Sequence, residues 1–167
     1  IVAAVGNGEQ FGVHVQYRAE QGAALETGGG IFNALPWLGP EAFVVVNSDV
    51  WTDFPYAQLP RVLPGNILAH LVLVDNPPQH PQGDFVLQQG RLVDWSGPRL
   101  TFSGIGVYRP ELFIGCSAGR FALAPLLRAA IAQGQVSGEH YLGPWFDIGT
   151  PQRLAELNTW LSTRAGP

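Results

Sequence analysis

Short runs of apolar residues, separated by loops rich in glycine and proline, predict the strands of this chain. The runs 43–46 and 67–74 are almost continuously apolar, which is typical of strands buried on both faces, and 100–108 is a third strong strand. Alternating apolar and polar residues over 13–17 predict a short strand with one exposed face. A small hairpin is expected over 84–94.

Apolar residues repeat with helical spacing in three other segments. Residues 31–38 predict a short helix that follows a glycine-rich loop over 22–30, and residues 121–133 predict a longer helix with one apolar stripe. The final helix is predicted to begin at Pro151, with Thr150 as its N-cap, because proline is favoured at the first helical position and threonine just before it.

These elements predict a single α/β domain over residues 1–167, with no internal repeat or linker to divide it. We expect a mostly parallel mixed sheet with flanking helices, and an antiparallel excursion near 84–108. Residues 141–148 are expected to add one more strand or extended segment.

The composition excludes several classes of protein. Hydrophobic residues make up 46% and charged residues 13%, against roughly 25% charged in an average protein. The chain is therefore predicted to be neither disordered nor a polybasic nucleic-acid binder. All nine cationic side chains are arginine, so an anionic ligand would be held by arginine, backbone N–H groups and metal.

The sequence also indicates the cellular compartment of the protein and whether the chain is a fragment. The lone Cys116 suits a reducing compartment, no apolar run reaches the ~18 residues of a membrane span, and no secretory leader is recognisable. We therefore expect a cytoplasmic protein that is not in a membrane. Because the chain begins at Ile1 and contains no methionine, we expect it to be a fragment.

Two aspartates end apolar runs in distant parts of the chain. Asp49 follows the strand 43–46, and Asp147 lies between Trp145 and Gly149 among apolar neighbours. Carboxylates at the carboxyl ends of strands lie where α/β sheets bind ligands, and two together suit Mg²⁺ with a nucleoside triphosphate. Each could instead be a turn or helix-capping aspartate, so the spacing alone leaves both interpretations open.

Other polar or glycine-rich positions give weaker signals. The glycines after Thr27 would let backbone N–H groups approach a phosphate or a nucleobase, although the loop is not a P-loop. Glu139 could contact a substrate hydroxyl or lie on an exposed loop. We expect His70 to be a hydrogen-bonded core histidine, whereas His80, on a proline-rich loop, could face an anionic ligand.

Four stretches, in this order, resemble the sugar-1-phosphate nucleotidylyltransferases. They are the nucleobase loop at 25–31, the first metal motif at 45–50, the sugar-binding glycine strand at 102–108 and the second metal motif at 145–151. Further stretches resemble the group within that family that acts on N-acetylmuramate α-1-phosphate in peptidoglycan recycling; these are 49–53, 74–77, 83–85 and 137–141.

The resemblance implies a Rossmann-like nucleotidyltransferase fold and a reaction between UTP and a sugar 1-phosphate that gives a UDP-sugar and pyrophosphate, with Mg²⁺ as cofactor. It implies that Asp49 and Asp147 are the catalytic metal ligands. The residues implied for nucleotide binding are Glu26, Thr27 and Gly28, and those for the sugar are Gly104, Asn76 and Glu139.

The sequence also departs from the family. The glycine-rich phosphate loop with its arginine and the lysine-proline motif that open the family's fold are absent, so we expect the N-terminal unit to be missing. The wider family places a sugar-binding glutamate where this chain has Ala122. Mannose-1-phosphate guanylyltransferase, glucose-1-phosphate thymidylyltransferase, a non-catalytic sugar-nucleotide-binding protein and a purely structural fragment stay open as alternatives, as does the oligomeric state.

Overall fold

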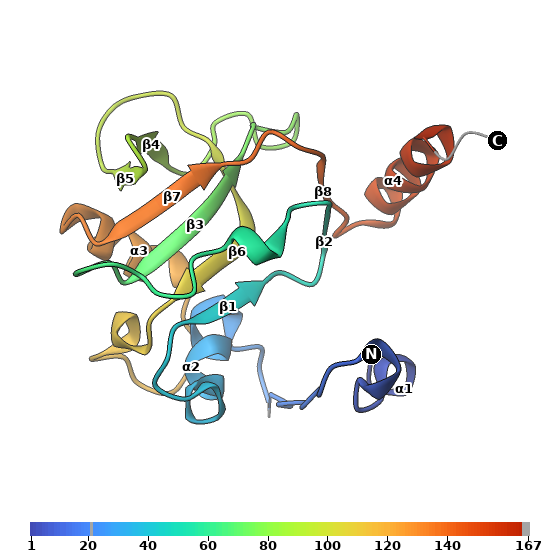
Figure 1. Ribbon diagram of the computed structural model, residues 1–167, viewed down its shortest axis with the longest axis horizontal. Helices are drawn as coiled ribbons and strands as arrows, with labels where there is room; N and C mark the ends of the chain where they lie inside the picture. Colours follow the sequence, from blue (N-terminus) through green and yellow to red (C-terminus); the bar gives the residue numbers. More distant parts are fainter. Residues whose placement is uncertain (21, 165–167) are drawn as a thin grey trace.

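The computed structural model describes residues 1–20 and 22–164. A six-stranded sheet carries helices on one face, and a separate two-stranded sheet lies beside it with the last helix (Figure 1). The helices are α1 (Val2–Val5), α2 (Glu26–Leu38), α3 (Leu123–Ala132) and α4 (Pro151–Arg164), with 3₁₀ turns at Glu9–Phe11, Tyr56–Gln58 and Pro110–Phe113. The strands are β1 (Phe43–Val46), β2 (Val50–Thr52), β3 (Ala69–Val74), β4 (Val86–Gln88), β5 (Arg91–Val93), β6 (Thr101–Tyr108), β7 (Val136–His140) and β8 (Trp145–Asp147).

The large sheet has the order β1-β6-β3-β7-β5-β4. This mixed sheet with flanking helices confirms the predicted fold class. The strands β1, β3, β7 and β4 run in one direction, but β6 and β5 run against them, so β3 with β7 is the only parallel pairing among the described strands of this sheet. The expectation of a mostly parallel sheet is therefore wrong for the strand pairings, because the antiparallel β6 lies between β1 and β3.

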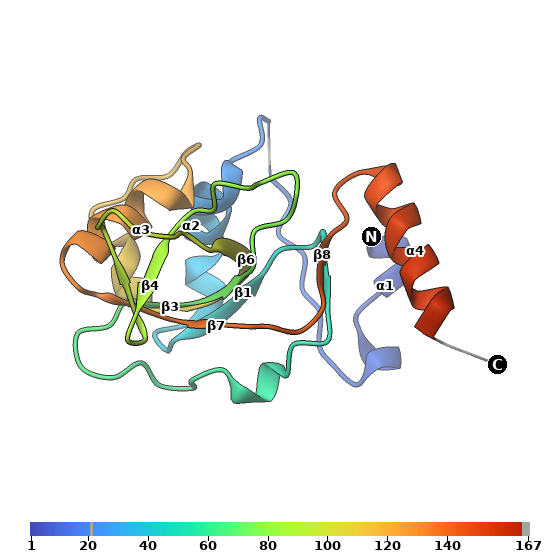
Figure 2. The ribbon, with the colours of Figure 1, turned by 90° about the horizontal axis from the view of Figure 1, so that it is seen from above.

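Two hydrophobic clusters lie on the two faces of this sheet. Figure 2 shows α2 and α3 on one side, where they cover β3 and its neighbours, and the segment between β2 and β3 on the other. The central strand β3 is buried along nearly its whole length, as its apolar run predicted. Tyr108 on β6 is fully buried, and burial raises the pKa of its phenol because the charged form would lose its hydration.

Four predicted elements are confirmed with small shifts in their bounds. The hairpin β4–β5 turns at Gln89 and Gly90, which have φ of 49° and 75°, the geometry that a tight two-residue turn requires. Helix α3 matches the predicted amphipathic helix, and α4 begins at Pro151. The Thr150 hydroxyl accepts a hydrogen bond from the Arg153 N–H at 3.3 Å, so Thr150 is the N-cap.

The predicted strand over 13–17 is wrong, because residues 14–20 have no regular secondary structure and no neighbouring strand to pair with. The prediction that β1 is buried on both faces is also wrong. It is an edge strand, and Val44 and Val46 are 50% and 41% exposed. An apolar run thus indicated a strand correctly but not its place in the sheet.

The glycine-rich loop predicted over 22–30 is largely wrong, because α2 begins at Glu26 and includes three glycines in its first turns. A Cβ on Gly29 would lie 2.2 Å from the Gly119 carbonyl oxygen, and a Cβ on Gly28 would lie 2.6 Å from the Phe121 ring. These glycines therefore allow a helix and a loop to pack closely, despite their low helix propensity.

Strand β7 was not predicted, since its polar sequence was interpreted as an exposed loop or a substrate contact. It pairs with the buried β3, and Gly138 allows that packing. A Cβ on Gly138 would lie 2.5 Å from a Leu92 methyl group and 2.8 Å from the Leu71 carbonyl oxygen.

Among the described residues, no helix is long and apolar enough to span a membrane.

Candidate active site

Asp49 and Asp147 are brought together by the small two-stranded sheet. The strands β2 and β8 pair antiparallel, with Val50 opposite Asp147, and the Ile148 N–H donates to the Asp49 carbonyl oxygen at 2.7 Å. Asp49 directly precedes β2 and Asp147 ends β8, so the pairing places both side chains at the same end of this sheet. The structure thus places together the two carboxylates that the sequence singled out.

Gly149 leaves open space between the two carboxylates. A Cβ at this position would lie 3.0 Å from Asp49 Oδ2 and 3.2 Å from Asp147 Oδ1. The two oxygens are therefore separated by no more than the sum of these distances. Because only glycine lacks a Cβ, the space between the carboxylates depends on this residue.

Asp147 has two further contacts. Its Oδ1 accepts a hydrogen bond from the Gly149 N–H at 3.0 Å, and its Oδ2 forms an ion pair with Arg153 Nη1. The Arg153 guanidinium also donates through Nε to the Thr150 hydroxyl at 3.2 Å. The first turn of α4 therefore fixes both the carboxylate and the cation beside it.

A hollow of about 210 Å³ opens at the two aspartates, and Gly104 and His80 line it as well. Gly104 has φ of +82°, and a Cβ there would lie 2.8 Å from the Asn47 side chain. The residue must therefore be glycine for both conformational and steric reasons. Its place in the hollow agrees with the predicted contact to a sugar, although the role itself stays a prediction.

An adjoining hollow of about 410 Å³ contains Glu26 and Thr27, and it shares Asn47 and Phe102 with the first hollow. Two of the three residues predicted for nucleotide binding thus line a hollow that adjoins the one at the aspartates. The third, Gly28, is buried.

Glu26 has an unusual backbone conformation. Its φ is +61°, in the left-handed region, and its carboxylate pairs with Arg120 Nε at 2.7 Å. Such strain in a residue other than glycine is often found at ligand sites. Ala122, where the wider family has a glutamate, lines the same hollow.

A third hollow, of about 850 Å³, lies between the loop after β3 and the start of α4, and it shares Trp145 and Asp147 with the first. Arg153 and Tyr141 line it. Burial and the hydrogen-bonded Asp53 carboxylate raise the pKa of the Tyr141 phenol. The first hollow, which contains both aspartates, therefore shares lining residues with each of the other two.

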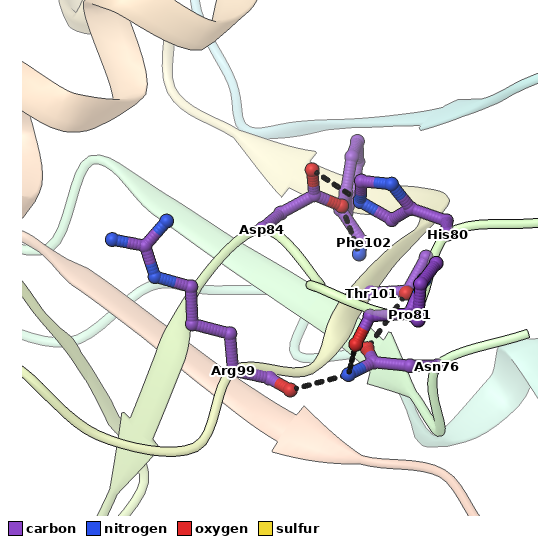
Figure 3. A network of polar contacts seen from close by, with 7 residues as sticks. All are labelled: Asn76, His80, Pro81, Asp84, Arg99, Thr101 and Phe102. Carbon is purple, nitrogen blue, oxygen red and sulfur yellow. Dashed lines mark hydrogen bonds and ion pairs between the residues drawn. The ribbon is translucent and has the colours of Figure 1, made fainter.

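Asn76 also lines the third hollow, but its amide is already used within the protein (Figure 3). Its Nδ2 donates to the carbonyl oxygens of Pro81 and Arg99, at 3.2 and 2.9 Å, and its Oδ1 accepts from the Thr101 hydroxyl at 2.9 Å. The structure therefore gives Asn76 a role in holding the loop over 75–84, rather than a free amide for the sugar.

Asp84 was not singled out as a functional residue, although it ties the same loop to β6. Its Oδ2 accepts from the Phe102 N–H at 2.8 Å, and its Oδ1 lies 3.1 Å from His80 Nε2 (Figure 3). The bond to Asp84 positions His80 at the first hollow. The only sequence signal for Asp84 was the family resemblance of residues 83–85.

Glu139 does not line any of the three hollows. It lies on β7 opposite Val72, whose side chain packs in the cluster on the sheet face away from α2 and α3. His70 connects it to Ser137, with Nε2 3.2 Å from Glu139 Oε1 and Nδ1 2.9 Å from Ser137 Oγ. The expected hydrogen-bonded His70 is confirmed, but the position of Glu139 gives no support for a substrate contact.

Solved structures of other proteins share the fold of this chain. The putative glucose-1-phosphate thymidylyltransferase of Bacillus anthracis, in complex with sucrose, has a TM-score of 0.76 at 17% identity, over 95% of this chain and 70% of that one. The inositol-1-phosphate CTP transferase of T. maritima has a TM-score of 0.65 at 16% identity, over 83% and 62% of the two chains. The fold is that of the sugar-phosphate nucleotidyltransferases.

Two curated relatives are more similar in sequence, and both are named N-acetylmuramate alpha-1-phosphate uridylyltransferase. The protein of Neisseria meningitidis serogroup B is 48% identical over 160 residues, which cover 92% of this chain and 69% of the relative. The protein of Caulobacter vibrioides is 32% identical over 156 residues, covering 82% and 64%. No protein-family model matches the chain. The chain belongs to the N-acetylmuramate alpha-1-phosphate uridylyltransferase family.

Proposed function

We propose that this chain carries most of the active site of an enzyme that transfers a uridylyl group from UTP to N-acetylmuramate α-1-phosphate. The products are the UDP-sugar and pyrophosphate. The observation that carries the proposal is the pairing of β2 with β8, which sets Asp49 and Asp147 on two sides of Gly149. It is supported by 48% identity to a relative named for this activity.

We assign residues 1–167 to one nucleotidyltransferase domain. The cell-wall sugar in the relatives' name also leads us to place the reaction in peptidoglycan recycling in the cytoplasm.

Asp49 and Asp147 are the proposed ligands of Mg²⁺. Their oxygens are the hard donors that this ion prefers, and it is commonly held by one or two carboxylates together with substrate phosphates. No group of three or more histidine, cysteine, aspartate or glutamate side chains is placed to hold a metal in residues 1–20 and 22–164. When bound, the ion supplies positive charge that offsets the repulsion between two phosphates and the charge that develops between them.

The protein's own contribution is to position the substrates. The sugar phosphate is the nucleophile: its oxygen attacks the α-phosphorus of UTP in line, and pyrophosphate leaves on the opposite side, so no protein nucleophile is needed. Glu26 and Thr27 line the hollow proposed for the nucleoside, and Gly104 leaves room for the sugar against β6. Both hollows meet at Asn47, so the two substrates would approach each other beside Asp49.

The proposal is tested by pyrophosphate release from the full-length gene product. UTP, GTP, CTP and dTTP are each combined with N-acetylmuramate 1-phosphate, mannose 1-phosphate and glucose 1-phosphate. The expected result is that UTP with N-acetylmuramate 1-phosphate gives the highest kcat/KM. Release that is faster with another pair would replace the substrate assignment, and no release with any pair would overturn the proposed activity.

A further inference from the structure

Both carboxylate oxygens of Asp147 already have partners within the protein. Oδ1 accepts from the Gly149 N–H, and Oδ2 is paired with Arg153 Nη1. Both side chains of the ion pair are partly accessible, at 28% for Arg153 and 32% for Asp147. A divalent ion that is held by Asp147 must therefore share this carboxylate with a guanidinium or displace it.

The Arg153 guanidinium reaches the space between the two aspartates. Its Nη2 lies 3.7 Å from the position of a Gly149 Cβ, the same position that lies 3.0 Å from Asp49 Oδ2. A guanidinium so close to this space repels a divalent cation that enters it, because both carry positive charge and the site is only partly hydrated. The two cations therefore compete for one carboxylate.

The described residues provide no second permanent cation at the two hollows that contain Asp147. Among the described residues that line the two hollows containing Asp147, Arg153 is the only arginine, and the chain has no lysine. The bond from Nε to the Thr150 hydroxyl holds the base of the guanidinium at the first turn of α4. Arg153 also lines the third hollow, so a guanidinium released from Asp147 would have that space to move into.

We propose that Arg153 is an internal counter-ion of Asp147 that competes with the divalent metal, so that metal binding frees the guanidinium. This inference rests on the proposed function, since it takes Asp147 as a metal ligand. Arg153 acts here as a positioning residue, because it holds the Asp147 carboxylate and does not itself take part in the transfer.

The first test measures Mn²⁺ binding by electron paramagnetic resonance on the full-length gene product. The R153Q variant should bind the ion about three- to tenfold more tightly than the unchanged protein, because one partly exposed, charge-assisted pair no longer competes. The matched control is R164Q, which removes the same charge from the same helix, where Arg164 stacks on Trp160 at 4.3 Å. The Mn²⁺ affinity of R164Q should stay within about twofold of that of the unchanged protein. An equal gain in Mn²⁺ affinity in both variants, or no gain in R153Q, would overturn the proposal.

A second test follows metal binding in the unchanged protein and uses a variant only to assign one resonance. The Nε–H resonance of Arg153, assigned by its disappearance in R153K, should shift as Mg²⁺ is added and saturate at the concentration that fills the metal site. A resonance that stays in place while the metal binds contradicts the proposed release. If the unchanged protein binds no divalent ion, the metal pair and the proposed function fail together, whereas normal binding that R153Q does not alter removes the counter-ion role alone.

Discussion

Gly149 determines the space between Asp49 and Asp147, because a Cβ at its position would lie 3.0 and 3.2 Å from their oxygens. Gly104 has a similar effect at the other side of the same hollow, where its positive φ and the nearby Asn47 side chain exclude any other residue. At the scale of single residues, the candidate site is therefore shaped by glycines as well as by carboxylates.

The G149A variant tests this role of Gly149. The added methyl group should project between the carboxylates and reduce Mn²⁺ affinity and turnover by about tenfold or more, since a misplacement of ~1 Å at a reacting centre is enough for such losses. Calorimetry and pyrophosphate release measure the two effects. A suitable control is G97A, whose methyl group would lie no closer than 3.4 Å to Val86. Normal metal binding by G149A would show that this space is not used.

The residues of the site could be predicted from the sequence only in part. Asp49 and Asp147 were found because each follows an apolar run, and α/β sheets bind ligands at strand ends. The family resemblance also implied Glu139 and Asn76 as sugar contacts, because a sequence does not show that a side chain is already paired with His70 or held by Pro81 and Thr101. Arg153 was not singled out, since its contact with Asp147 depends on how α4 turns at Thr150.

At the scale of elements, the loop over 75–84 is held mainly by side chains, together with a backbone hydrogen bond of 2.8 Å from the Asp84 N–H to the Leu100 carbonyl oxygen. Asn76 and Asp84 together make five hydrogen bonds to groups outside their own backbone, and Phe102 and Thr101 on β6 are among the partners. The loop carries His80, and each of the three hollows is lined by at least one of its residues. The position of the loop therefore affects the whole site.

The N76A variant should lower the free energy of unfolding by about 1–3 kcal/mol, because it leaves the carbonyl and hydroxyl groups around it without their partner. Denaturant unfolding measures this change. Q79A, on the same loop, serves as the control and should change stability by no more than about 0.5 kcal/mol. A loss in N76A as small as that in Q79A would mean that the loop is held by other contacts.

Elements were predicted best where packing and local preference agree. The strand β3 and the hairpin β4–β5 follow their apolar runs and turn residues closely. The strand β7 and the first turns of α2 were missed, because their glycines are retained for close contacts with distant residues such as Leu92 and Gly119. A local pattern contains no information about such contacts.

At the scale of the whole molecule, the candidate site lies at the junction between the large sheet and the unit formed by β2, β8 and α4 (Figure 1). An aromatic cluster holds this unit together: the Trp160 ring on α4 lies 5.4 Å from that of Trp51 and 5.0 Å from that of Phe146. Trp145 joins the unit to the large sheet through a hydrogen bond of 2.9 Å from its indole to the Ser103 carbonyl oxygen. None of these long-range contacts could be read from the sequence.

The W160A variant should loosen α4 and with it the ion pair between Arg153 and Asp147. The expected loss of stability is about 1–3 kcal/mol, less than for a fully buried tryptophan because Trp160 is only partly buried. Hydrogen exchange compares W160A with the unchanged protein. The substitution should speed up exchange at the α4 amides more than at those of β3, which lies in the buried core. If α4 and β3 lose protection equally, the unit does not move separately from the large sheet.

The central claim is that Asp49 and Asp147 hold one divalent ion between them. The most direct measurement is the number of Mn²⁺ ions bound per chain in the full-length gene product and in its D49N and D147N variants. The account predicts one ion that is lost, or weakened by more than about tenfold, in each variant, together with a fall in turnover of about a hundredfold or more and an unchanged melting curve. An ion that stays bound with normal affinity when either aspartate is replaced would contradict it.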